Sequence, residues 1–221
     1  MIECQDVSFS YPASTLPDSE RQAGGALKHI SCTIEDGSFV LLCGTSGCGK
    51  TTMTRLFNGL IPHYHEGTYT GSVYLDGKDT RDLSLFDISL KVGSVFQNPR
   101  SQFFNVDTTS ELAFGPENHG IAEDLVRDRV KRVAAQLKLE PLLDRSIFSL
   151  SGGEKQKLSI VRSLSKDSSL ILLDEPTSAL DQKSITTLIE YLELRKQQAI
   201  IVIVSHDSRI LSSCDELVEM R

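Results

Sequence analysis

The stretch FVLLCGTSGCGKTT, residues 39–52, decides how this chain folds. It begins with an apolar run, and residues 44–51 then match the pattern G-x-x-x-x-G-K-[ST] in full. Between a buried strand and a helix, such a loop holds a polyphosphate on its backbone N–H groups. The lysine then supplies a charge near the β- and γ-phosphates, and the threonine hydroxyl can reach Mg²⁺. The stretch therefore predicts an α/β fold with a phosphate loop, whose candidate binding residues are Gly44, Thr45, Ser46, Gly47, Cys48, Gly49, Lys50, Thr51 and Thr52.

Three further apolar runs have the composition of strands in the middle of a sheet: KVGSVF at 91–96, LILLD at 170–174 and AIIVIV at 199–204. Apolar residues also recur at helical spacing in three sets: Met53, Leu56, Phe57 and Leu60; Val126, Val130, Val133 and Leu137; and Ile185, Leu188, Ile189 and Leu192. This alternation predicts a mostly parallel sheet covered by helices. Runs at 2–11, 27–39 and 71–79 predict a smaller antiparallel sheet near the N-terminus, with a polar loop at 13–26.

The length and composition limit the class of protein. A chain of 221 residues predicts one domain with a sizeable core. The net charge of −7 argues against a broad nucleic-acid surface, which needs many Lys and Arg contacts to phosphates. The longest aliphatic run has six residues, whereas a membrane span needs roughly 20. We therefore expect a cytosolic chain that reaches a membrane only through a partner. Five cysteines without a CxxC pair favour reduced thiols.

Acidic and histidine side chains follow two of the predicted buried strands. Asp174 and Glu175 come at the end of LILLD, and His206 comes just after AIIVIV. In phosphoryl-transfer sites an Asp at a strand end holds Mg²⁺, usually through water. The adjacent Glu can then orient or deprotonate the attacking water. We therefore expect Asp174 to bind the metal, and Glu175 and His206 to be catalytic residues beside the phosphate loop.

A second candidate anion site begins at Ser151. In SLSGGEKQK, residues 149–157, Ser151 and Glu154 have the spacing of a capping box, which by itself predicts only a well-capped helix. Gly152 and Gly153 lower helix propensity and bare the backbone, which favours the close approach of a ligand. If that ligand belonged to the chain's own phosphate loop, one γ-phosphate would be held twice by one chain. The pattern therefore predicts that residues 151–154 serve a nucleotide on a second chain, in a head-to-tail pair.

Four segments, GTSGCGKTT, LSGGEKQK, LILLDEPTSALD and VSHD, occur in an order that resembles the nucleotide-binding domain of an ABC ATPase over essentially the whole chain. The resemblance implies a P-loop NTPase of the α/β class, with a mostly parallel core sheet, an N-terminal antiparallel β-subdomain and a helical signature-motif subdomain at roughly 98–165. It implies ATP and Mg²⁺ as ligands. It also implies that Tyr11 stacks on adenine and that the loop Ser178–Asp181 crosses the dimer. By the same resemblance, Gln97 is a metal-binding and catalytic residue that links Mg²⁺ and the attacking water to a transmembrane partner.

A finer resemblance rests on VFQNPRSQFFNVDTTSELAFGPEN, residues 95–118, with a second glutamine at Gln102. This stretch is similar to the ATPase subunits of energy-coupling factor (ECF) transporters, which take up vitamins and transition-metal ions. The resemblance implies a peripheral subunit at the cytoplasmic face of the membrane that hydrolyses ATP. Its implied partners are a second ATPase subunit, identical or paralogous, a transmembrane T subunit and a substrate-binding S subunit. Phe103 and Phe104 either line the groove for the T subunit or pack in the core.

Three features depart from the family pattern. Glu154 stands where many relatives have Gln, and Lys157 stands where Arg is common. The chain ends at Arg221 without the C-terminal extension that is usual in ECF ATPases. The alternatives are the ATPase of another ABC importer, an ABC-type ATPase that acts on DNA or ribosomes, and a regulatory module that binds ATP without turnover. The lack of a coiled-coil insertion counts against the second alternative, and the intact catalytic residues count against the third.

Overall fold

The protein is described by a computed structural model that covers residues 1–12, 27–98 and 102–220. The polar loop expected at 13–26 lies outside the described residues, as do residues 99–101 of the ECF-like stretch.

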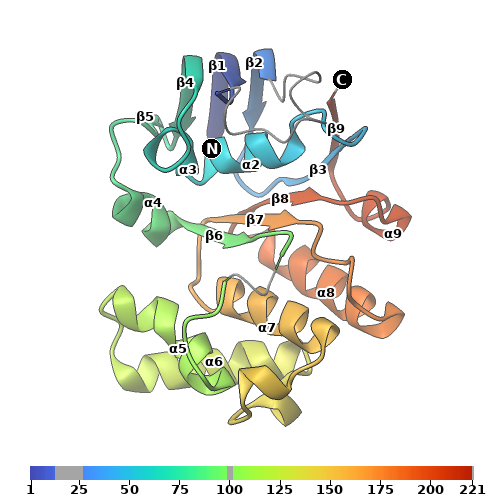
Figure 1. Cartoon of the computed structure of the whole chain (residues 1–221). Coiled ribbons are helices and arrows are strands. Elements are labelled where there is room, and N and C mark those ends of the chain that lie inside the picture. Colours follow the sequence, from blue (N-terminus) through green and yellow to red (C-terminus); the bar gives the residue numbers. More distant parts are fainter. Residues whose placement is uncertain (13–26, 99–101, 221) are drawn as a thin grey trace.

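Strands and helices alternate along most of the chain (Figure 1). In chain order the elements are β1 (Ile2–Ser10), β2 (Leu27–Ile34), β3 (Phe39–Gly44), α2 (Lys50–Phe57), α3 (Leu60–His63), β4 (Thr68–Leu75), β5 (Lys78–Asp79), α4 (Leu85–Lys91), β6 (Val92–Val95), α5 (Thr108–Asn118), α6 (Glu123–Gln136), η2 (Glu140–Leu142), η3 (Ile147–Ser149), α7 (Gly152–Leu164), β7 (Leu170–Asp174), α8 (Gln182–Arg195), β8 (Ile200–Val204), α9 (Ser208–Leu211) and β9 (Glu216–Met220). Within the described part of the chain, each helix is too short or too polar to cross a membrane.

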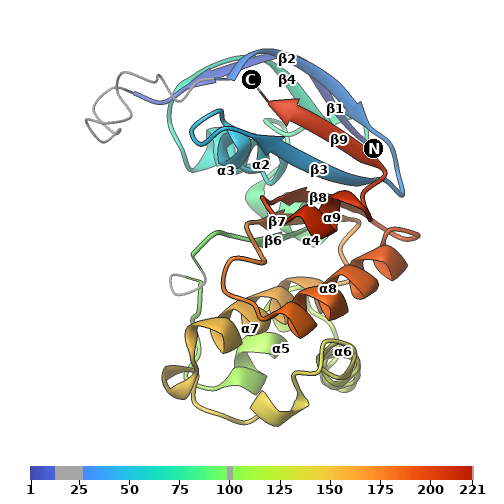
Figure 2. The same cartoon turned by 90° about the vertical axis from the view of Figure 1, so that its right-hand side faces the viewer.

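The strands form two sheets. The first, in the order β2-β1-β4-β5, is antiparallel, and the second, in the order β6-β7-β8-β3-β9, is parallel. Both predicted sheets are therefore confirmed. Figure 2 shows the antiparallel sheet curving over α2 and α3, with the parallel sheet beneath them. Helices α5 to α8 lie on the opposite side of the parallel sheet.

The central parallel strands are buried on both faces, which explains their unbroken apolar runs. On β3, Phe39 and Leu41 pack into the core that the sheet shares with α5 to α8. Val40 and Leu42 pack into a second core, beneath the antiparallel sheet and against α2. Because successive side chains of a strand point to opposite faces, one apolar run supplies both cores.

The first predicted helix is shorter than its apolar spacing indicates. Helix α2 ends at Phe57, and Leu60 is only half-buried and begins the separate helix α3. Gly59, between the two, has a left-handed φ of 73°. A Cβ atom at Gly59 would clash with the Cδ1 atom of Ile88 on α4. The prediction that Leu60 continues the helix is wrong, because the chain turns at Gly59 where α4 packs against it. The other two apolar sets lie on α6 and α8, with Leu137 as the residue that caps α6.

Helix α5 lies in residues 98–123, where apolar residues recur only weakly at helical spacing. Asp107 caps this helix by accepting a hydrogen bond from the backbone N–H of Ser110 at 2.8 Å. Its core-facing side carries Glu111, whose side chain is 0% exposed and lies 2.6 Å from the guanidinium of Arg162 on α7. A buried carboxylate interrupts the apolar stripe by which a helix is recognised in a sequence. The buried Glu111 thus explains why apolar residues recur only weakly along α5.

Strand β6 is an edge strand of the parallel sheet, and among the described residues it pairs only with β7. A Cβ atom at Gly93, in the middle of β6, would lie 2.8 Å from the carbonyl oxygen of Ser163 on α7. The missing side chain therefore lets β6 pack directly against α7.

Candidate functional site

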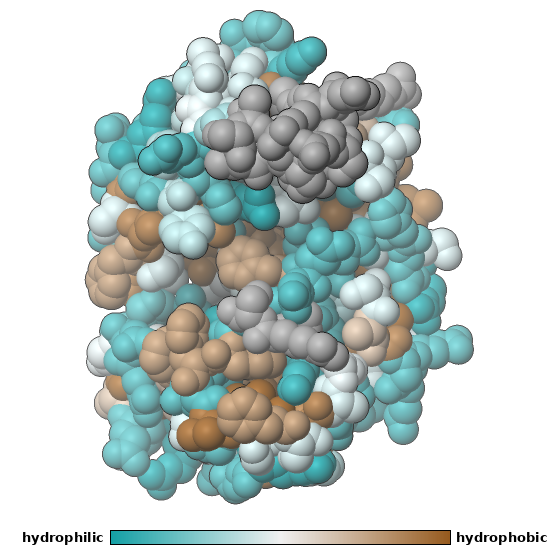
Figure 3. Space-filling view, viewed as in Figure 1, coloured by the Kyte–Doolittle hydropathy of each residue, from teal (hydrophilic) through white to brown (hydrophobic). Residues whose placement is uncertain are grey.

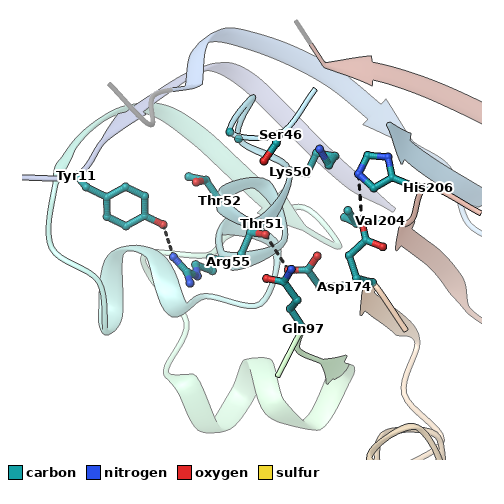
Figure 4. A pocket seen from close by; sticks show the side chains of 13 residues that line it. Tyr11, Ser46, Lys50, Thr51, Thr52, Arg55, Gln97, Asp174, Val204 and His206 are labelled. Atoms are coloured by element: carbon teal, nitrogen blue, oxygen red, sulfur yellow. Dashed lines mark hydrogen bonds and ion pairs between the residues drawn. The ribbon is translucent and has the colours of Figure 1, made fainter. Parts of the chain in front are cut away.

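A pocket of about 360 Å³ gathers most of the predicted site residues (Figure 4). Its wall comes from the loop after β3, helix α2, the second residue after β6, the ends of β7 and β8 with the residues that follow them, and the residue after β1. The lining residues are Tyr11, Ser46, Gly47, Gly49, Lys50, Thr51, Thr52, Arg55, Gln97, Asp174, Glu175, Val204 and His206. Because the carboxyl ends of parallel strands share one edge of the sheet, residues far apart in sequence converge here.

The phosphate loop turns through glycines in the left-handed region, with φ of 144° at Gly44, 81° at Gly47 and 101° at Gly49. Lys50 follows, and its ammonium donates hydrogen bonds of 2.9 Å to the carbonyl oxygens of Gly44 and Thr45. These bonds hold the lysine charge against the loop. The loop thus presents a cation and glycine backbone to the same pocket, which is the chemistry that binds phosphates.

A hydroxyl and a carboxylate meet at the floor of the pocket. The Oγ1 of Thr51 donates a hydrogen bond of 2.8 Å to the Oδ2 of Asp174. Burial raises the pKa of Asp174, and the hydrogen bond from Thr51 acts in the opposite direction. Adjacent ligands of octahedral Mg²⁺, each about 2.1 Å from the metal, are about 2.9 Å apart. The spacing of these two oxygens therefore fits a shared Mg²⁺ ion.

The residue after β7 has a strained backbone. Glu175 has a left-handed φ of 50°, which is uncommon for a residue with a side chain and is often found at functional sites. Its Oε1 lies 3.4 Å from the Nε2 of His206, which follows β8 (Figure 4). Burial raises the pKa of the Glu175 carboxyl, and the nearby imidazole of His206 partly opposes this shift. A carboxyl with a raised pKa is a better proton acceptor than an ordinary glutamate.

An arginine that the sequence interpretation missed also lines the pocket. The guanidinium of Arg55 donates a hydrogen bond of 2.8 Å to the hydroxyl of Tyr11 and lies 5.9 Å from the centre of its ring. Arg55 comes four residues after Thr51, so the helical spacing could have placed it on the same side of α2. Gln97 enters from the other side of the pocket, close to Asp174 (Figure 4).

A sequence model of the family described as ABC transporter matches residues 27–178 of the chain. The matched range holds the phosphate loop, the LSGGEKQK segment and both acidic residues at the end of β7. The chain belongs to the ABC transporter family. It carries the ATPase domain of that family, an ABC cassette.

Relatives of this ABC cassette cover its whole length. An ABC transporter ATP-binding protein of Treponema denticola is 42% identical over 222 residues, which is 100% of this chain and 44% of that protein. Another, from Pyrococcus horikoshii, is 40% identical over 99% of this chain and 75% of its own length. The chain therefore spans less than half the length of the Treponema protein.

Two solved structures share the fold. The cbiO1 protein of Clostridium perfringens, part of the ABC transporter complex cbiONQ, has a TM-score of 0.78 and 27% identity, over 100% of this chain and 84% of cbiO1. The dimeric cassette MJ0796, bound to ADP and Pi, has a TM-score of 0.84 and 24% identity, over 100% of this chain and 94% of MJ0796. The P-loop architecture expected from the sequence is therefore confirmed.

Residues 151–154 of this cassette, which we call the SGGE turn, contribute no side chain or backbone to the pocket lining. The turn begins α7 as a complete capping box: the Oγ of Ser151 accepts from the N–H of Glu154 at 3.3 Å, and the Glu154 carboxylate accepts from the N–H of Ser151 at 2.7 Å. The hydrogen bond from the Ser151 N–H to the carboxylate lowers the pKa of Glu154. The predicted helix cap is thus confirmed, and the binding of a second chain's nucleotide stays a prediction.

The two glycines of the turn have different surroundings. A Cβ atom at Gly153 would lie 2.7 Å from the carbonyl oxygen of Ala179, so this glycine is needed for packing within the chain. A Cβ atom at Gly152 would meet nothing within 4 Å. The sequence interpretation gave both glycines to a ligand. The structure provides a reason within the chain for Gly153 and none for Gly152.

Four other predicted residues also lie outside the pocket lining. Gly44 packs against β9, because a Cβ atom there would overlap the carbonyl oxygen of Met220. Thr45 accepts the lysine hydrogen bond described above, and the Sγ of Cys48 lies 3.8 Å from the same ammonium. Asp181 caps α8: its carboxylate accepts hydrogen bonds from the N–H of Ser184 at 2.8 Å and from the Ser184 hydroxyl at 2.9 Å. These two bonds lower the pKa of Asp181 to about 2. In this chain these residues shape the loops around the site.

Proposed function

We propose that this ABC cassette hydrolyses ATP in a head-to-tail pair. Each nucleotide lies between the phosphate loop of one chain and residues 151–154 of the other. One observation carries the proposal: the SGGE turn adds nothing to its own pocket, and Gly152 has open space beside it. The first N–H groups of a helix lack partners within the helix and attract anions. The start of α7 can therefore bind the γ-phosphate that the other chain holds.

The pocket residues suggest how ATP is held. We infer that the ring of Tyr11 stacks on adenine and that the loop N–H groups and Lys50 bind the phosphates. Thr51, Asp174 and Gln97 would hold Mg²⁺, which when bound neutralises charge on the β- and γ-phosphates.

The hydrolytic step falls to the residues after β7 and β8. Glu175 accepts a proton from the attacking water as the water oxygen bonds to the γ-phosphorus. The bond between that phosphorus and the β,γ-bridging oxygen breaks, and ADP and inorganic phosphate result. His206, 3.4 Å from the Glu175 carboxylate, is placed to orient this carboxylate and to contact the γ-phosphate.

An apolar face next to the pocket is the proposed site for the T subunit. We define this coupling face by its exposed residues Phe86, Leu90, Phe96, Phe104 and Val106. Figure 3 shows apolar side chains gathered on the side of the molecule that carries α4, β6 and α5. Phe104 is 72% exposed, and its ring stacks on Phe114 with 5.2 Å between centroids. Phe103 instead packs against the core. Of the two phenylalanines, Phe104 is the more exposed, and an exposed cluster of this kind typically marks an interface.

The finer assignment is an importer of the ECF type. The similarity to cbiO1, part of the complex cbiONQ, supports it, and so do Gln102 and the ELAFGPEN segment. In this proposal the chain is bound peripherally at the cytoplasmic face of the membrane, through a T subunit and together with an S subunit.

Co-purification from membranes tests the proposal. A tagged chain should bring a second ATPase chain, a T subunit and an S subunit with it, and the complex should hydrolyse ATP. Phe104→Glu should release the T subunit. Leu194→Glu, at a residue on α8 that is 65% exposed, is the matched control and should not. Membrane extracts in which the chain has no transmembrane partner, or equal behaviour of the two variants, would contradict the proposal.

A further inference from the structure

We propose that Gln102 is a positioning residue that fixes Gln97 and joins it rigidly to α7, the helix that begins with residues 151–154. The inference rests on the proposed function, because it explains how one chain couples its own nucleotide site to the site it shares with its partner.

Gln97 depends on its backbone for its place in the pocket. Its side chain is exposed and forms no hydrogen bond with another described residue. Nothing in the side chain's own contacts therefore determines where its amide lies. The backbone of the residues before and after Gln97 has to be held by something else.

Gln102 holds the backbone of the two residues that flank Gln97. Its side-chain Nε2 donates to the carbonyl oxygen of Phe96 at 3.1 Å and to that of Asn98 at 2.9 Å. An amide nitrogen carries two hydrogens, and here each hydrogen has one acceptor. Gln102 is only 6% exposed, so these bonds are made away from competing water.

Gln102 is in turn fixed to α7. The guanidinium of Arg162 donates a hydrogen bond to the backbone carbonyl of Gln102 and pairs with the buried carboxylate of Glu111. The other oxygen of Glu111 accepts from the backbone N–H groups of Phe104 and Asn105, both at 2.9 Å. The segment after residue 101 is therefore tied to α5 and α7 by charge-assisted hydrogen bonds, which are the strong kind.

These contacts form one continuous path. It runs from the backbone around Gln97, through the amide of Gln102, to Arg162 on the helix that begins with the SGGE turn. In the proposed pair, the first turn of that helix binds the partner's nucleotide. A movement of α7 towards that nucleotide would then move Gln97 in its own pocket.

The test is a double-mutant cycle in the complete transporter. Gln102→Glu keeps the shape of the side chain but replaces both donor hydrogens by an oxygen that repels the two carbonyls. We expect kcat for ATP hydrolysis to fall by about 10- to 100-fold, because small misplacements at a reacting centre have effects of that size. The affinity for ATP should change less than about twofold. Gln97→Ala should cause a similar loss of kcat.

The double variant gives the decisive result. If Gln102 acts through Gln97, then Gln97→Ala with Gln102→Glu should be no slower than Gln97→Ala alone. Losses that multiply would overturn the proposal, and so would a normal kcat in Gln102→Glu. Denaturation of each variant identifies a loss that comes from unfolding.

A second readout does not depend on hydrolysis. The chain has no tryptophan, so Gln97→Trp introduces a single fluorescent reporter. Adding Gln102→Glu should lower the emission anisotropy of this reporter, because its backbone is no longer held. An unchanged anisotropy would overturn the positioning role. A wild-type complex that does not hydrolyse ATP would instead refute the proposed function, and the anisotropy would still decide the role of Gln102.

Discussion

The substitution Gly152→Asp should keep the stability of the chain and lower its rate of ATP hydrolysis. Gly152 is the first residue of α7, and a side chain there meets nothing within 4 Å. Its φ is not in the left-handed region, so a residue with a side chain fits the backbone. An acidic residue at a helix N-terminus stabilises it by about 0.3–1 kcal/mol. We therefore expect Gly152→Asp to unfold no more easily than the wild type.

The same carboxylate should block hydrolysis. In the proposed pair it faces the partner's γ-phosphate, and two like unit charges about 5 Å apart at an effective dielectric constant of about 20 repel by about 3 kcal/mol. That energy corresponds to roughly a 10²-fold loss of kcat/KM. Gly152→Asn is the matched control, because it has nearly the same size without the charge.

The assay compares ATP hydrolysis by the two variants in the assembled complex. The ratio of kcat/KM for Gly152→Asn to that for Gly152→Asp isolates the effect of the charge. A fluorescent nucleotide measures ATP affinity of the single chain, which should stay the same in both. Equal hydrolysis by the two variants, or a loss of affinity in the single chain, would refute the view that the SGGE turn serves a partner's nucleotide.

Three other substitutions and conditions have defined outcomes. Glu175→Gln should slow hydrolysis by about 10²–10⁴-fold and leave ATP binding intact, because it removes the proton acceptor; near-normal turnover would exclude this role. Burial raises the pKa of Glu175, so the carboxylate becomes protonated, and kcat should fall, at a pH above the ordinary glutamate pKa of about 4.3. A pH profile of kcat without this fall at acidic pH would contradict the assignment. Gly153→Ala should lower the free energy of unfolding by about 1–2 kcal/mol, because its Cβ atom would press on the carbonyl of Ala179; chemical denaturation measures the change, and an unaltered midpoint would show that the backbone yields without cost.

The sequence allows the central sheet to be predicted because each of its main strands is apolar on both faces. Residues 39–42 show no alternation, and in the structure they supply two cores. The phosphate loop was predictable for a similar reason, since its glycines are required by left-handed backbone at Gly44, Gly47 and Gly49. Features that depend on a short stretch of chain can therefore be predicted from the sequence of that stretch.

Contacts between distant segments cannot be predicted in this way. The need for glycine at residue 153 comes from Ala179, which belongs to the segment after β7. The left-handed backbone of Glu175 arises where the chain leaves β7. Phe103 and Phe104 are adjacent and equally apolar, yet Phe103 is half-buried against the core and Phe104 is exposed. Only the tertiary packing around them decides which is which.

The position of β6 divides the sheet into a stiff part and a compliant part. Glu175 and His206 follow β7 and β8, which have a neighbour on each side, whereas Gln97 follows a strand paired, among the described residues, on one side only. Gly93 seats this strand directly on α7. In the proposed mechanism, a tilt of α7 would therefore shift β6 while breaking few ladder hydrogen bonds, and Glu175, the proposed proton acceptor, would stay in place. In this way α7 could move Gln97 without displacing the residues that follow β7 and β8.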